Sequence, residues 1–153
     1  MTTYLWLKLV HIVSATILFG TGLGTAFFML RAYLAGSDET LAATTRSVVL
    51  ADWLFTTPAV VIQLLTGVWL MRTLNMPFDS TWFVVVIGLY VFVGICWVPV
   101  VWIQVRMRDL IASGAAKSEL RPLMRAWILL GIPAFASVLL LFFLMVSKAG
   151  AYG

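Results

Sequence analysis

Four long apolar segments constrain the fold of this chain more than any other feature. They cover residues 4–30, 48–71, 82–105 and 126–146. A helix needs about 20 predominantly apolar residues to cross the hydrocarbon core of a bilayer, and each segment is long enough. In lipid, isolated strands would leave backbone groups without hydrogen bonds, whereas helices satisfy their own. The sequence therefore predicts an all-α bundle of four transmembrane helices that forms a single domain, residues 1–153.

The composition agrees with a lipid environment. Hydrophobic residues make up 63% of the chain and charged residues 10%, and the mean hydropathy is +1.06. A water-soluble domain of this size needs more polar surface. The formal charge of +4 is expected to face anionic lipid rather than nucleic acid, because no basic run alternates with exposed aromatic residues. The predicted partner is the lipid bilayer.

Basic residues predict the orientation. The connections at residues 31–47 and 106–125 contain seven Lys and Arg residues, against three on the other side, which are Lys8, Arg72 and Lys148. Because Lys and Arg collect in cytoplasmic loops, both termini are expected outside the cytoplasm, an N-out/C-out arrangement. The stretch Met107–Met124 is expected to lie along the lipid headgroups.

His11 is the only histidine, and it lies inside the first apolar segment. Ionisable and amide side chains within a membrane are costly, so each is expected to have a partner or a function. The residues three and four positions from His11 along its helix are mostly small or polar, which predicts a face directed into the bundle. Gln63 with Thr66 and Tyr90 are expected at a similar depth. A purely structural interpretation makes His11 a hydrogen-bond partner of Gln63 or Tyr90.

A second polar layer is predicted nearer the cytoplasm. Asp52 is expected to open the second helix, while Gln104 and Arg108 lie four residues apart and therefore on one face of the third. The second and third helices are joined by a short connection and are expected to be antiparallel neighbours. The sequence therefore predicts an Asp52–Arg108 ion pair, with Gln104 as a polar anchor at the helix end.

Two further features concern packing. Gly20 and Gly24 form a G-x-x-x-G pair, which permits close approach of another helix within the bundle or in a homo-oligomer. Cys96, the single cysteine, is expected to be a buried and inert thiol. Together with His11 it offers too few ligands for a zinc site.

Three stretches carry a resemblance to a known family: LWLKLVHIVSATILFGTGLGTAFFMLRAY, LADWLFTTPAVVIQLLTGVWL and CWVPVVWIQVRMRDL. They resemble small bacterial predicted integral membrane proteins of unknown function, and the match covers most of the chain. The resemblance implies a multi-pass protein of the bacterial inner membrane with four helices. It implies no established activity.

A more distant resemblance is confined to the first helix. The W-x-K-x-x-H run at Trp6, Lys8 and His11 resembles the start of the HemJ-type protoporphyrinogen oxidases and of the CopD-type copper-resistance membrane proteins. HemJ-type bundles are understood to hold haem b, so this resemblance implies His11 as an axial ligand of the haem iron. Met145 is expected at a similar depth as a sixth ligand, unless two copies share a haem through paired His11. Lys8 is expected to meet a propionate.

Three functional hypotheses follow. The first is a haem-b redox or electron-transfer membrane protein. The second is a small transporter or permeation module, whose polar path consists of Asp52, Gln63, Gln104 and Arg108. The third is a non-catalytic subunit or assembly factor, in which the same polar groups only fix the packing. A Ser/His/Asp hydrolase is excluded, because no nucleophile and acid are evident beside His11.

Overall fold

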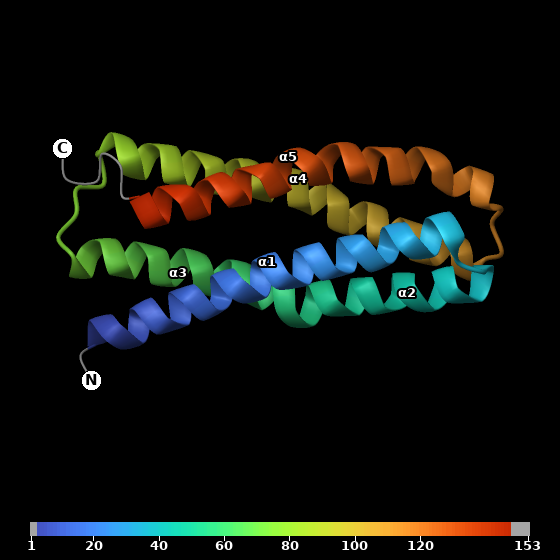
Figure 1. The fold of residues 1–153 in the computed structure, drawn as a ribbon, viewed down its shortest axis with the longest axis horizontal. Coiled ribbons are helices and arrows are strands. Elements are labelled where there is room, and N and C mark those ends of the chain that lie inside the picture. Colours follow the sequence, from blue (N-terminus) through green and yellow to red (C-terminus); the bar gives the residue numbers. More distant parts are fainter. Residues whose placement is uncertain (1–2, 148–153) are drawn as a thin grey trace.

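The computed structural model describes residues 3–147, and nearly all of them are helical. The elements are α1 (Thr3–Ala35), α2 (Asp38–Ala51), the π-helix η1 (Asp52–Thr56), α3 (Thr57–Thr73), α4 (Thr81–Ala112) and α5 (Lys117–Ser147). Since α2, η1 and α3 follow one another without a break, they form one long helix, and the chain makes four passes (Figure 1). All four are long and apolar enough to cross a membrane. The all-α, four-span prediction is confirmed.

The two ends of the bundle differ. One end, here called the loop end, contains the short connections at residues 36–37 and 113–116 (Figure 1). The opposite end, the terminal end, contains Thr3, Ser147 and the connection at residues 74–80. The loop end is the one that the basic residues predict to be cytoplasmic. Lys148, one of the three basic residues counted on the other side, lies outside the described residues.

The helices extend farther at the loop end than the apolar segments predict. The segment Met107–Met124, expected to lie along the headgroups, instead continues α4 and begins α5. The chain reverses at residues 113–116, where Gly114 adopts a φ of 79°, a left-handed conformation that favours glycine. Polar residues do not end these helices, because exposed polar side chains beyond the hydrocarbon are compatible with helix.

Pro58 accounts for the π-helix. Proline lacks an amide hydrogen, and its ring clashes with the carbonyl group four residues earlier. Directly before it, the backbone N–H of Thr57 donates to the Asp52 carbonyl five residues back, and the Thr57 hydroxyl donates to the same oxygen at 2.9 Å. A single π-turn therefore accommodates the proline within a continuous helix. Asp52, predicted to open the second helix, lies well inside it.

The buried core lies in the loop-end half, where α2 packs between α1 and α4. Its side chains are Met29, Ala32, Leu41, Val48, Ile103, Met107, Leu120, Met124 and Trp127. In the terminal half α1 packs on α3 and α4 on α5. The Phe19 ring joins these two pairs, with centroids 5.0 Å from Phe135 and 5.4 Å from Phe142. Large apolar side chains elsewhere face outward along every pass, as lipid contact requires.

Candidate functional site

The cluster around His11 joins α1 to α3 in the terminal half. His11 Nδ1 lies 2.9 Å from Thr66 Oγ1, and His11 Nε2 lies 3.0 Å from the Gln63 amide nitrogen. Ser14, buried three residues after His11, donates from its hydroxyl to Gln63 Oε1 at 2.5 Å. The predicted proximity of His11, Gln63 and Thr66 is therefore confirmed. We refer to His11, Ser14, Gln63 and Thr66 as the His11 cluster.

Hydrogen-bond directions in this cluster fix the tautomer of the imidazole. The Thr66 hydroxyl lies 2.6 Å from the Ile62 carbonyl oxygen and donates to it, so it accepts the bond from His11. Nδ1 therefore carries the proton. Nε2 then has a lone pair, and it accepts from the Gln63 amide, whose oxygen accepts from Ser14. These donor and acceptor roles are mutually compatible, and they hold the ring as the neutral Nδ1–H form.

Gly67 completes the seat of the imidazole. A Cβ atom at this position would lie 3.3 Å from His11 Cε1, tighter than an ordinary contact. The missing side chain lets the ring approach the α3 backbone. Sequence reasoning did not identify Ser14 or Gly67. Helical spacing could have predicted Ser14, because a residue three positions after His11 lies on the same face of the helix.

The other residues predicted for this site lie apart from the His11 hydrogen bonds. Tyr90 donates its hydroxyl to the Val60 carbonyl at 2.6 Å, so it joins α4 to α3 rather than meeting His11. Lys8 is exposed one turn from His11, and its Nζ lies 5.8 Å from the Tyr4 ring centroid. Met145 is half-buried on α5.

Asp52 and Gln104 form a second polar site. Both side chains are buried, with 4% and 3% of their surface exposed. Asp52 Oδ1 accepts a hydrogen bond from the Thr56 hydroxyl at 2.8 Å, and the Gln104 side chain approaches the carboxyl group from α4. Asp52 Oδ2 and Gln104 Oε1 have no hydrogen-bond partner among the residues that the structure describes. The predicted neighbourhood of Asp52 and Gln104 is correct, whereas Gln104 is a buried group rather than an anchor at the helix end.

The predicted Asp52–Arg108 ion pair is wrong. Arg108 pairs with its sequence neighbour Asp109, with Nη2 2.8 Å from Oδ1, and both side chains are substantially exposed. The reason is depth: Gln104 is the α4 side chain that meets Asp52, and Arg108 lies one helical turn farther toward the loop end. The Arg108–Asp109 pair is the one salt bridge among residues 3–147. Asp52 therefore has no cationic partner within those residues.

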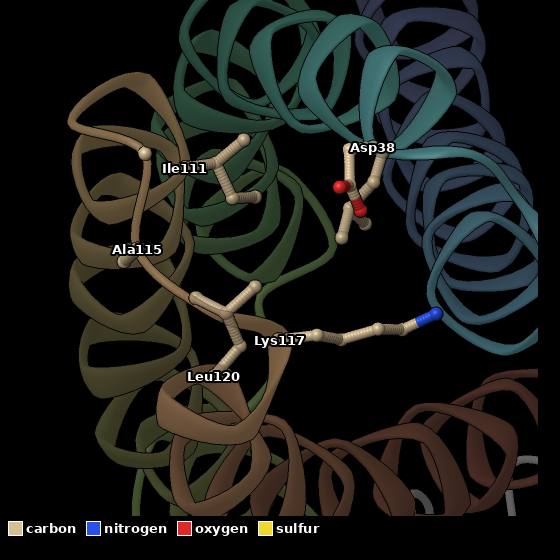
Figure 2. Close-up of a pocket in the computed structure, with 7 residues that line it drawn as sticks. Asp38, Ile111, Ala115, Lys117 and Leu120 are labelled. Carbon is tan, nitrogen blue, oxygen red and sulfur yellow. The ribbon is translucent and has the colours of Figure 1, made fainter.

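A small pocket of about 100 Å³ opens at the loop end, remote in the chain from both polar sites (Figure 2). Lys117 extends across it toward α1, and its Nζ lies 5.3 Å from the Tyr33 ring centroid. Its lining comes from α2, α4, α5 and their connection: Asp38, Leu41, Ile111, Gly114, Ala115, Lys117 and Leu120. Sequence reasoning did not predict this pocket. Its mixed lining assigns it no chemistry.

Among residues 3–147, no three His, Cys, Asp or Glu side chains gather into a group that could hold a metal ion. Cys96 is buried as a free thiol, as predicted. Gly20 and Gly24 have open space where their Cβ atoms would stand, so no helix of this chain packs closely there. Contact with a second copy at these glycines stays a prediction.

The comparison with known proteins gives the family. No curated protein and no solved structure matches the chain. A family model does match, over residues 5–149, and its description is "Predicted integral membrane protein". This match includes all four passes and both polar sites. The chain belongs to this family of predicted integral membrane proteins, domain of unknown function 2269.

Proposed function

We propose that this chain is a haem-b-binding protein of the bacterial inner membrane, active in electron transfer, with His11 as an axial ligand of the iron. The observation that supports the proposal most is the tautomer of His11. A histidine that binds iron uses a neutral ring nitrogen and donates the N–H of the other to a neighbour. His11 has this arrangement, because Thr66 accepts from Nδ1 and leaves the lone pair on Nε2.

The residues fit such a ligand if one side chain moves. The Gln63 amide lies 3.0 Å from Nε2, where the iron would bind. Gln63 is unbranched and half-buried, so its side chain has rotamers that leave Nε2 free. The Thr66 bond is made by Nδ1, the nitrogen that would not bind iron, and is kept.

Two further residues have roles under this proposal. The exposed Lys8, one turn nearer the terminal end, would hold a propionate through its ammonium group. Met145 would act as the sixth ligand from α5. A bound haem supplies one-electron transfer, and His/Met ligation suits that role. The protein contributes the orientation of His11 and an apolar surrounding.

The test is the visible spectrum of the full chain, expressed with a supply of haem and purified in detergent. The wild type is expected to show a Soret band, and His11→Ala is expected to lose it. Gln63→Ala is the informative companion, because removing the amide frees Nε2 and should keep or increase the haem content. Met145→Leu should retain haem and change the reduced spectrum.

The hypothesis of a non-catalytic subunit or assembly factor gives a different pattern. If the His11 cluster only fixes the packing, then His11→Ala and Gln63→Ala both lower stability and neither changes a spectrum. A wild-type protein without a Soret band after haem-replete expression would overturn the haem proposal.

A further inference from the structure

Asp52 is a buried carboxyl group inside a membrane-spanning helix, and no cation among residues 3–147 pairs with it. Its side chain is 4% exposed. Arg46 on its own helix, Arg31 on α1 and Arg106 on α4 are exposed. Arg108, farther along α4, is bonded to Asp109. The groups that interact with the carboxyl are the Thr56 hydroxyl and the Gln104 side chain, and neither is ionisable.

Two buried oxygen atoms at this site lack hydrogen-bond partners within the described part of the chain. Asp52 Oδ1 accepts from Thr56, but Oδ2 accepts from nothing, and Gln104 Oε1 is equally unpaired. Both atoms are acceptors when the carboxyl group is ionised. Buried polar atoms rarely lack a hydrogen bond. Two neighbouring acceptors without a donor therefore indicate that a donor hydrogen is missing at this site.

The missing donor is best supplied by a proton. An ionised carboxylate without a cation in this interior costs far more than one hydroxyl bond returns. A proton on Oδ2 removes that charge and also makes Oδ2 a donor toward an acceptor. A hard metal cation fits less well. Such ions take about six to eight oxygen ligands, and the described side chains here are Asp52, Thr56 and Gln104.

We propose that Asp52 is a proton-binding site inside the bundle, with the proton held on Oδ2 and donated to Gln104 Oε1. The carboxyl group exchanges this proton with water without any redox partner. The π-helix places the carboxyl at this point, since Asp52 is the first residue of η1 and its backbone carbonyl accepts both bonds of Thr57. The inference does not depend on haem, because Asp52 and His11 belong to different clusters.

Infrared spectroscopy of the full chain in lipid vesicles at neutral pH tests the proposal. The wild type is expected to show the C=O stretching band of a protonated carboxylic acid, shifted by exchange into D₂O. Asp52→Asn should lose the band and Gln104→Leu should shift it, because the acceptor of the proton is removed. Asp79→Asn is the matched control, since Asp79 is exposed in the connection between α3 and α4, and it should leave the band unchanged.

The unfolding midpoint is a second measurement, which shows whether a variant has lost the infrared band because its folding has changed. An amide resembles a neutral carboxyl group in shape and donates a similar bond to Gln104, so Asp52→Asn should unfold at the wild-type midpoint. A band independent of Asp52, or no band at all, would overturn the proposal in favour of an ionised carboxylate served by internal water. A comparison of unfolding in sodium and in choline salts tests the alternative of a bound metal cation. A wild-type unfolding midpoint that rises in Na⁺ relative to choline, and no longer rises in Asp52→Asn, would replace the proton with a metal cation.

Discussion

In the haem-free protein, where Gln63 bonds to His11 Nε2, replacing Gln63 with leucine measures how strongly the His11 cluster holds α1 against α3. The Gln63 amide makes two bonds to α1, accepting from Ser14 Oγ at 2.5 Å and donating to His11 Nε2 at 3.0 Å. Interhelical hydrogen bonds in membrane proteins average about 0.6 kcal/mol and reach about 1.7 kcal/mol. Two bonds therefore contribute about 1.2 kcal/mol, with an upper bound of about 3.4 kcal/mol. Without Gln63, the Ser14 hydroxyl hydrogen turns to the His11 carbonyl oxygen, which lies 2.9 Å from Ser14 Oγ, so a loss of about 1–2 kcal/mol is expected.

The assay is unfolding in mixed micelles of mild detergent and SDS, followed by tryptophan fluorescence. A double-mutant cycle of Gln63→Leu with Ser14→Ala should give a coupling energy of about 0.6–1.7 kcal/mol. Thr25→Ala is the control, because the Thr25 hydroxyl bonds only to the backbone of its own helix at Thr21 and Gly22. Its effect should add to that of Gln63→Leu. A Gln63→Leu protein as stable as the wild type, or a zero coupling with Ser14, would refute the proposed role of the cluster.

Three smaller perturbations use the same assay. Gly67→Ala places a Cβ 3.3 Å from His11 Cε1, so the ring must shift, and a loss of about 1 kcal/mol is expected; an unchanged midpoint would mean that the ring has free space. Arg108→Ala removes an exposed ion pair with Asp109 and should lower stability by less than about 0.5 kcal/mol. A much larger loss of stability would favour an Asp52–Arg108 ion pair instead. Tyr90→Phe removes a 2.6 Å bond to an α3 carbonyl and should cost about 0.5–1.5 kcal/mol, unless water replaces the hydroxyl.

The His11 cluster was largely predictable because helices of constant rise convert residue number into depth. Counting inward from the ends of two antiparallel apolar segments places Gln63 and Thr66 beside His11, and the structure joins the three. Tyr90 shows the limit of this reasoning. It lies on α4, yet its hydroxyl bonds to Val60 rather than to His11. Depth alone does not define which helix a side chain faces.

The Asp52 site was only partly predictable, for two physical reasons. Hydropathy marks where a helix enters lipid, not where it ends, so the extension of α4 past Arg108 is invisible to it. With Asp109 adjacent, Arg108 has a local partner that needs no helix packing. A π-turn also leaves no hydrophobic pattern in the sequence. Pro58 indicates only that the regular helical hydrogen bonds are interrupted in the turn before it.

That π-turn decides which helix each polar site faces. Gln63 lies eleven positions after Asp52, and because an α-helix has about 3.6 residues per turn, this spacing would place both on one face. In the structure Asp52 meets Gln104 of α4, whereas Gln63 meets His11 of α1. The wider turn of η1 rotates α3 relative to α2 by roughly a quarter turn, which separates the two faces.

Deleting one residue of η1 tests this account. Trp53 is suitable, because its side chain is 60% exposed and its own contacts matter little. The deletion should restore α-helical register and turn Asp52 and Gln63 to the same face, so that one site loses its partner. In that background Gln63→Leu should no longer lower stability, or the Asp52 infrared band should disappear. Trp53→Ala keeps the π-turn and should retain both effects in full, and a deletion protein that also retained both would show that η1 does not set the two faces.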